Sequence, residues 1–143
     1  MPDAPRLLEA ALRRGKRCYL PVMSRFGADR LRFRRVRKGS ALSSRNAMRI
    51  PEPTRSALCP PRALSLVLLP LVGFDAHGGR LGNGGGYYDR ALAGPRIGRR
   101  PRRVGYAYAV QGVDALPMDA FDVRLDAVVT ERGWTRFPNP DPR

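Results

Sequence analysis

The chain has 143 residues, with 27 lysines and arginines against 12 acidic residues, which gives a formal net charge of +15. Its hydrophobic fraction of 43% suits a single globular domain with one core. No apolar run reaches the roughly 20 residues of a membrane span, and the N-terminus lacks the basic-then-apolar order of a signal peptide. Two distant cysteines provide neither a disulfide framework nor a zinc site. We therefore expect a cytoplasmic, soluble protein that does not bind membranes.

The positive charge is carried almost entirely by arginine, because Lys16 and Lys38 are the two lysines. Such a preference is typical of a GC-rich genome, and the arginines are scattered, with the densest groups at 30–38 and 96–103. We interpret the charge as an arginine-rich surface that assists an anionic ligand. A dedicated nucleic-acid footprint is the alternative.

The first third of the chain predicts a helix, two strands and a loop. Residues 5–14 place their apolar side chains on one stripe at helical spacing, and Gly15 follows as a stop signal. Residues 17–22 form a short apolar strand, and residues 30–37 alternate with arginines as in an outer strand. Four prolines in residues 49–63 indicate a loop.

The rest of the chain predicts strands that alternate with turns and a short helix. The run "LSLVLLPL" at 64–71 is typical of a strand buried on both faces. Turn residues follow, and the stretch 84–94 begins a helix that Gly94 and Pro95 end. Residues 103–110 and 125–131 predict two further strands.

Helices interleaved with buried strands imply an α/β fold, an α/β sandwich built on a mainly parallel sheet. We expect one domain over residues 1–134 and a loose tail over 135–143.

The stretch "RLGNGGGYYDR", residues 80–90, has four glycines in five positions, followed by two tyrosines and an aspartate. A glycine-rich turn between a buried strand and a helix offers backbone N–H donors to phosphate oxygens. It lacks the lysine of a P-loop, and Tyr87 occupies the last glycine position of a dinucleotide fingerprint. A tight turn that uses glycine for positive φ is the purely structural alternative. Arginine, phenols and a carboxylate beside it suit a nucleotide phosphate, Mg²⁺ and a planar substrate.

The segment 66–92, "LVLLPLVGFDAHGGRLGNGGGYYDRAL", resembles the signature of the 5-formyltetrahydrofolate cyclo-ligases, also called methenyltetrahydrofolate synthetases. Weaker similarity continues through "RGKRCYLP" at Arg14, "IPEP" at Ile50 and the block 111–131. The resemblance implies a three-layer α/β/α sandwich. It also implies conversion of 5-formyltetrahydrofolate to 5,10-methenyltetrahydrofolate with ATP and Mg²⁺, releasing ADP and phosphate. In this chemistry the formyl oxygen attacks the γ-phosphate, N10 closes the ring and phosphate leaves. A monomer that binds this small molecule, and no nucleic acid, is expected.

The resemblance also implies roles for residues of the glycine stretch. The metal ligands would be Asp89 and Asp122, with Asp126 and the weaker Asp119 as rivals for the second place. Residues that would also contact the folate are Gly84, Gly85, Gly86, Tyr87 and Tyr88. The nucleotide loop would consist of Arg80, Leu81, Gly82, Asn83, Gly84, Gly85, Gly86, Tyr87 and Tyr88.

Two other residues have competing interpretations. His77 is interpreted as a surface turn residue rather than an acid–base group, and Glu52 matches the family's Glu-Pro but equally suits a rigid loop.

The chain departs from the family pattern at its beginning, where a basic helical segment and a substrate-binding glutamate would normally stand. Two explanations are open: an internal methionine of a longer gene, or a truncated paralogue. Either would remove phosphate-binding cations and is expected to lower activity. A non-catalytic, arginine-rich protein that binds RNA or a phosphorylated metabolite on the same fold is the alternative function. A different ATP-using enzyme on the same scaffold is a third.

Overall fold

A computed structural model of the chain describes residues 2–23, 31–38 and 57–138. The chain divides into two compact units, one of Asp3–Pro61 and the other of Arg62–Arg143 with the first two residues. Within the described residues no helix is long and apolar enough to cross a membrane. The expectation of a single domain over residues 1–134 stays a prediction.

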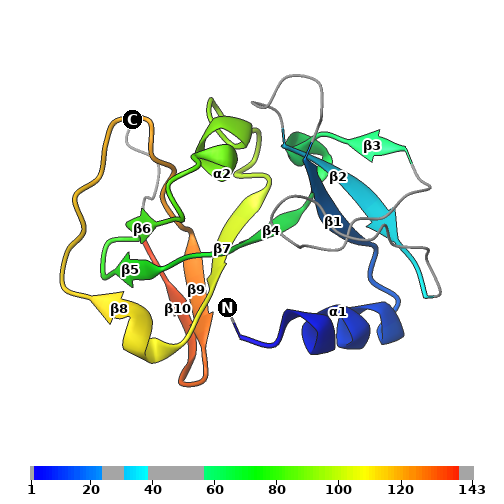
Figure 1. Ribbon diagram of the computed structural model, residues 1–143, viewed down its shortest axis with the longest axis horizontal. Helices are drawn as coiled ribbons and strands as arrows, with labels where there is room; N and C mark the ends of the chain where they lie inside the picture. The colour runs from blue at the N-terminus through cyan, green and yellow to red at the C-terminus, as the bar shows by residue number, and fades with distance from the viewer. Residues whose placement is uncertain (1, 24–30, 39–56, 139–143) are drawn as a thin grey trace. The chain divides into compact units, whose positions relative to one another are not determined.

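The first unit contains a helix and an antiparallel sheet (Figure 1). Helix α1 (Ala4–Arg13) begins where the Asp3 carboxylate accepts a hydrogen bond of 3.2 Å from the Arg6 amide, and it ends before Gly15, whose φ is +73°. Strands β1 (Cys18–Met23), β2 (Leu31–Val36) and β3 (Leu58–Cys59) pair in that order. The predicted helix and the two predicted strands of this part are confirmed within one or two residues.

The second unit contains a four-stranded sheet with the order β10-β9-β7-β4. The parallel strands are β4 (Leu66–Leu69), β7 (Arg102–Tyr106) and β9 (Ala127–Thr130), and β10 (Gly133–Arg136) pairs antiparallel with β9. A smaller sheet has the order β6-β5-β8 and consists of β5 (Gly73–Asp75), β6 (Arg80–Leu81) and β8 (Gly112–Val113). The short helices are η1 (Pro61–Ala63), α2 (Tyr87–Ala91) and η2 (Ala109–Gln111).

The described residues therefore form a mixed α/β structure of small sheets in which strands predominate. The parallel β4–β7–β9 arrangement agrees with the expected parallel sheet, but the other strand pairs are mostly antiparallel. Two- and three-residue strands such as β5, β6 and β8 are too short to leave a periodic pattern in the sequence.

Two local expectations are wrong. The run at 64–71 is not buried on both faces, because Val67 and Leu69 are buried while Leu66 is 43% exposed at the edge of the sheet. The supposed loose tail starts later than residue 135, since β10 continues to Arg136 and Phe137 is buried. Residues 139–143 lie outside the described residues.

The core of the four-stranded sheet brings the segments around the glycine stretch against one face. Successive side chains of a strand alternate between the two faces, so Gly105 and Val128 share the face opposite to that of Val104 and Ala127. A Cβ added at Gly105 would lie 2.8 Å from Leu71 Cδ2 and 3.0 Å from Leu125 Cδ1. Both leucines are buried, so this close approach depends on glycine.

Replacing this glycine is expected to destabilise the fold. Gly105→Ala should lower the free energy of unfolding by about 1–3 kcal/mol, because the added methyl group overpacks two buried leucines. Urea denaturation measures the change, with the exposed Ser65→Ala as the control, for which we expect less than about 0.5 kcal/mol. Equal stability of both variants would show that the core accommodates the methyl group.

Candidate functional site

The turn before the glycine stretch is built on a buried aspartate. Asp75 is 3% exposed, and its carboxylate accepts hydrogen bonds from the amides of His77 (2.9 Å), Gly79 (2.7 Å) and Leu116 (2.9 Å). Burial alone would raise the pKa of Asp75, but the three amide donors and nearby His77 outweigh it, so this pKa lies below its usual value. A Cβ at Gly79 would collide with the carboxylate. Asp75 thus fixes the turn and attaches it to the segment that begins at Leu116.

Arg80, the first residue of the stretch, is buried and held at both ends of its guanidinium group. Nη1 donates to the Pro70 carbonyl at 3.1 Å, and Nη2 forms an ion pair of 3.2 Å with Asp89 Oδ1. Nε is buried and has no partner within the described part of the chain. A Cβ at Gly82 would lie 2.9 Å from Nη1, so the glycine leaves room for the arginine.

The middle of the stretch presents bare backbone at the surface. Asn83, Gly84 and Gly85 are exposed, and Gly84 has a φ of +93° with nothing within 4 Å of an added Cβ. Gly86, with φ +67°, is the N-cap of α2, which has only five residues. So short a helix has little macrodipole, and we attribute any affinity for anions to the loop amides instead.

The two tyrosines that follow differ in environment. Tyr88 is half-buried, and burial raises its pKa to about 12 although the nearby Arg80 charge opposes the rise. Its phenol therefore stays protonated at neutral pH and can donate a hydrogen bond. The Tyr87 ring lies under the Arg90 guanidinium carbon, 5.2 Å from the ring centroid.

Asp89 joins the stretch to a segment that is distant in sequence. Its Oδ1 atom pairs with the Arg80 guanidinium group and also accepts a 3.0 Å hydrogen bond from the Val123 amide. Val123 follows Asp122, whose Oδ2 atom accepts a 2.9 Å hydrogen bond from the Asp119 amide. Each of the two predicted metal ligands thus has one carboxylate oxygen without a protein donor in the described residues.

The rival ligand Asp126 is occupied elsewhere. Both its carboxylate oxygens bond the Arg96 guanidinium, at 2.6 Å and 3.0 Å, and Oδ2 also accepts from the Arg103 amide at 2.7 Å. The Arg96 and Asp126 side chains are only 4% and 13% exposed. We conclude that Asp126 has a structural role, whereas Asp119 keeps an exposed side chain.

The remaining residues considered in the sequence analysis are His77 and Glu52. His77 is exposed, as expected of a surface turn residue, and its carbonyl accepts from Arg124 at 3.3 Å. Glu52 and the "IPEP" stretch lie outside the described residues. The importance of Asp75 was missed, although an aspartate just before a Gly-Gly turn is a recognisable signal for such side-chain bonds.

No group of three or more histidine, cysteine, aspartate or glutamate side chains is placed to hold a metal within residues 2–23, 31–38 and 57–138. A cation at Asp89 and Asp122 would need further oxygen ligands from water or from a bound phosphate, which is common for Mg²⁺.

Comparison with known proteins shows to which family the chain is similar. The chain matches the model of the 5-formyltetrahydrofolate cyclo-ligase family over residues 2–131. It is 41% identical over 130 residues to the 5-formyltetrahydrofolate cyclo-ligase of Escherichia coli K12, covering 90% of this chain and 70% of that protein. The Mus musculus 5-formyltetrahydrofolate cyclo-ligase is 27% identical over 135 residues, covering 87% of this chain and 65% of that protein.

Two solved structures of 5,10-methenyltetrahydrofolate synthetases resemble the fold of this chain. The NMR structure of 5,10-methenyltetrahydrofolate synthetase from Aquifex aeolicus matches with a TM-score of 0.77 at 34% identity, covering 99% of this chain and 67% of that one. A 5,10-methenyltetrahydrofolate synthetase from Mycoplasma pneumoniae matches with a TM-score of 0.59 at 28% identity, covering 84% and 59%.

The Asp75 turn should be sensitive to acid. Because the pKa of Asp75 is lowered on folding, its stabilising contribution is complete above the unfolded pKa of about 3.9 and is lost as pH falls through the folded value. Asp75→Asn should lower the free energy of unfolding at pH 7 by about 2 kcal/mol. The reason is that the asparagine NH₂ group cannot accept a hydrogen bond, whereas both carboxylate oxygens of Asp75 accept from backbone N–H groups. Urea titrations should show the difference from the parent chain shrinking below about pH 4. A difference that is independent of pH, or as small as that of the exposed Asp114→Asn control, would contradict this role.

The Arg96–Asp126 pair should matter for stability and not for metal binding. Asp126→Asn leaves a buried guanidinium without its carboxylate and is expected to lower the free energy of unfolding by about 3 kcal/mol. Asp119→Asn, at an exposed carboxylate, should change it by less than about 0.5 kcal/mol. Thermal denaturation and Mg²⁺ titration together decide the role. A stable Asp126→Asn protein with impaired Mg²⁺ binding would make Asp126 the ligand.

Proposed function

Because the chain belongs to the 5-formyltetrahydrofolate cyclo-ligase family and has its activity, we propose that the stretch 80–89 together with Asp122 forms its ATP and Mg²⁺ site. One observation carries the proposal. The Asp89 carboxylate bonds Arg80 at the start of the glycine stretch and the amide of Val123, next to Asp122. This hydrogen bond brings the segment that carries Asp122 next to Asp89, although the two aspartates are 33 positions apart in sequence.

The chemistry of the two carboxylates fits Mg²⁺. This ion prefers six oxygen ligands and usually takes one or two carboxylates, with water and phosphate oxygens completing the set. Asp89 Oδ2 and Asp122 Oδ1 have no protein donor in the described residues, so both are available, whereas both oxygens of Asp126 are not. Bound there, Mg²⁺ would neutralise charge on the triphosphate.

The glycine stretch would supply the nucleotide and folate contacts. Exposed backbone at Asn83 to Gly85 allows phosphate oxygens to approach the amides without obstruction by Cβ atoms. The folate would contact Gly84 to Tyr88, where the protonated Tyr88 phenol can donate a hydrogen bond. The Arg80 side chain is buried and each of its Nη atoms bonds a protein oxygen, so it would act as a positioning residue that holds Asp89.

In this reaction the bonds are made and broken between ATP and the folate, and the protein forms no covalent bond. The formyl oxygen attacks the γ-phosphate, ADP leaves, N10 attacks the activated carbon and phosphate departs as the ring closes. Positioning and charge stabilisation are the main contributions expected of an enzyme of this kind. The family match favours this function over a non-catalytic binding protein. A three-layer α/β/α sandwich and a monomeric state are further parts of the proposal, the first supported by the parallel β4–β7–β9 sheet.

Substitution of the two carboxylates tests the site. Asp122→Asn and Asp89→Asn should each raise the Mg²⁺ concentration for half-maximal turnover by at least about tenfold, because each loses a charged oxygen ligand. Formation of the methenyl product is followed by its near-ultraviolet absorbance with 5-formyltetrahydrofolate and ATP. Asp114→Asn, in an exposed loop of the same unit, is the matched control and should behave like the parent chain.

The two variants also separate ligation from folding. Asp89→Asn removes the Arg80 ion pair and should lower the melting temperature as well, whereas Asp122→Asn should not, since its carboxylate bonds only a local amide. An Asp122→Asn enzyme with normal Mg²⁺ dependence would remove this residue from the site. A folded parent chain without ATP-dependent turnover would refute the assignment of activity to this chain.

A further inference from the structure

A hollow with several arginines lies at the edge of the four-stranded sheet. The hollow of about 120 Å³ is lined by Arg99, Arg102, Val104, Asp126, Ala127, Trp134, Arg136 and Phe137. None of these residues belongs to the glycine stretch or its partners.

Strand alternation places the strand residues that line this hollow on one face of the sheet. Arg136 pairs with Ala127, which pairs with Val104, so Arg102, Val104 and Ala127 share a face with Arg136 and Trp134. The opposite face carries Gly105, against which Leu71 and Leu125 pack. These leucines belong to the segments that hold the glycine stretch.

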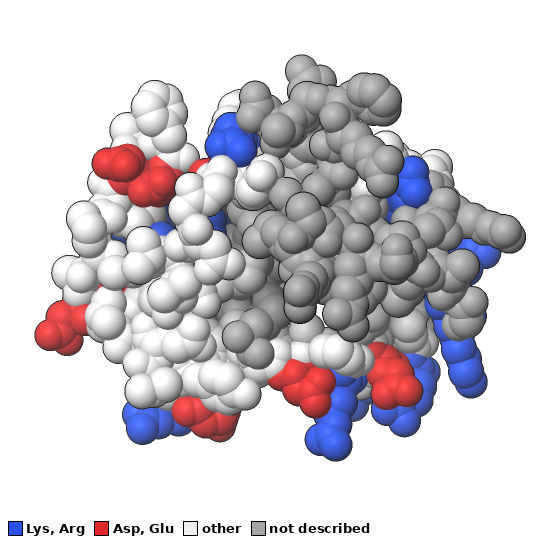
Figure 2. All heavy atoms as spheres, in the orientation of Figure 1, with Lys and Arg blue, Asp and Glu red and all other residues white. Residues whose placement is uncertain are grey.

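The charge of the hollow is not compensated. The guanidinium groups of Arg99, Arg102 and Arg136 form no hydrogen bond or ion pair with any residue in the described part of the chain. Asp126 also lines the hollow, but its charge is already matched by Arg96. Figure 2 shows lysines and arginines together in blue, at several separate places on the visible face. Three unpaired arginines around one hollow therefore form a local anion site.

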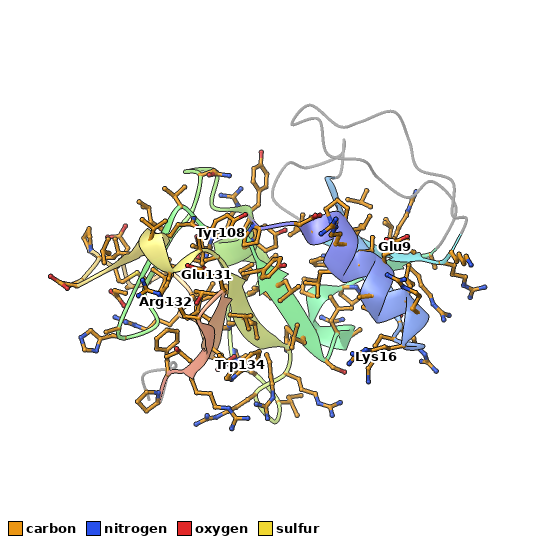
Figure 3. All side chains as sticks on the ribbon, turned by 90° about the horizontal axis from the view of Figure 1, so that it is seen from below. Glu9, Lys16, Tyr108, Glu131, Arg132 and Trp134 are labelled. Atoms are coloured by element: carbon orange, nitrogen blue, oxygen red, sulfur yellow. The ribbon has the colours of Figure 1, made fainter. Side chains whose placement is uncertain are left out.

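The size of the hollow and the neighbouring indole narrow the choice of anion. A volume of about 120 Å³ holds a phosphate group but not a whole nucleotide, given the roughly 30 Å³ that one water occupies in the liquid. Trp134 (labelled in Figure 3) is 50% exposed, so part of its ring is free to stack against a flat group outside the hollow.

We propose that this hollow binds the phosphate group of a nucleotide, either free or within a single-stranded nucleic acid, while the base stacks on Trp134. The inference is independent of the cyclo-ligase activity, because Arg99, Arg102, Trp134 and Arg136 lie outside the stretch 80–89 and Asp122.

Trp134 provides the readout, since it is the single tryptophan of the chain. We expect its fluorescence to be quenched on titration with adenosine monophosphate or a six-nucleotide oligoadenylate, without Mg²⁺. The double variant R102Q/R136Q should weaken the binding by about tenfold for each guanidinium removed. The matched control is Arg13→Gln, at an exposed position of α1 in the other unit, which should bind like the parent chain.

The outcomes separate the sources of the phosphate. Saturation by the monophosphate at the same nucleotide concentration as the oligomer identifies a free nucleotide. Tighter binding of the oligomer, with affinity falling steeply with salt, identifies a single-stranded nucleic acid. Inorganic phosphate that competes as well as the nucleotide would refute stacking on Trp134. Quenching unchanged in R102Q/R136Q, or absent in the parent chain, would overturn the proposal. The double variant should keep the parent turnover of 5-formyltetrahydrofolate, so failure here is distinguishable from failure of the catalytic assignment.

Discussion

The proposed active site depends on one carboxylate oxygen. Asp89 Oδ1 accepts from the buried Arg80 guanidinium and from the Val123 amide, so it fixes both the start of the glycine stretch and the segment that carries Asp122. Arg80 is in turn fixed by the Pro70 carbonyl, which directly follows the edge strand β4. The exposed glycines lie between Arg80 and Asp89, whose side chains form an ion pair, so bare backbone is presented between two fixed points. The second Asp89 oxygen is left for a cation.

A second aspartate holds the same two segments together further along. Asp75 bonds two amides of its own turn and the Leu116 amide, and its carboxylate occupies the space that a side chain at Gly79 would need. Residues 116–123 are thus attached at both ends to the region around the glycine stretch. Such double attachment reduces the freedom of Asp122 before any ligand binds, which favours pre-organisation of the site.

The sequence predicted those features that depend on local pattern. Helix α1 and strands β1, β2, β7 and β9 follow from periodicity and stop signals, and the dense motif around the glycines identified the family. Features that depend on tertiary contacts could not be predicted from the sequence. The choice between Asp122 and Asp126 requires knowing that Arg96, 30 positions from Asp126, occupies the latter. Likewise, the exposure of Leu66 depends on its edge position, and the strand at Gly133–Arg136 depends on its pairing with β9.

The net charge of +15 has at least two separate uses in this structure. Arg80 and Arg96 are buried and stabilise carboxylates, and they belong to the fold. Arg102 and Arg136 are exposed and line the hollow beside Trp134. The number of arginines in the sequence does not distinguish buried, paired arginines from exposed ones, because the distinction depends on what each guanidinium group contacts in the fold.

Paramagnetic relaxation by Mn²⁺ in place of Mg²⁺ tests the central claim most directly. In a ¹⁵N-labelled chain with ATP, the account predicts that Mn²⁺ broadens the amide signals of Val123 and of the glycine stretch most strongly. The Arg103 amide, which bonds Asp126, should be affected less. Strongest broadening at Arg103, or equal weak broadening throughout, would contradict a cation site formed by Asp89 and Asp122.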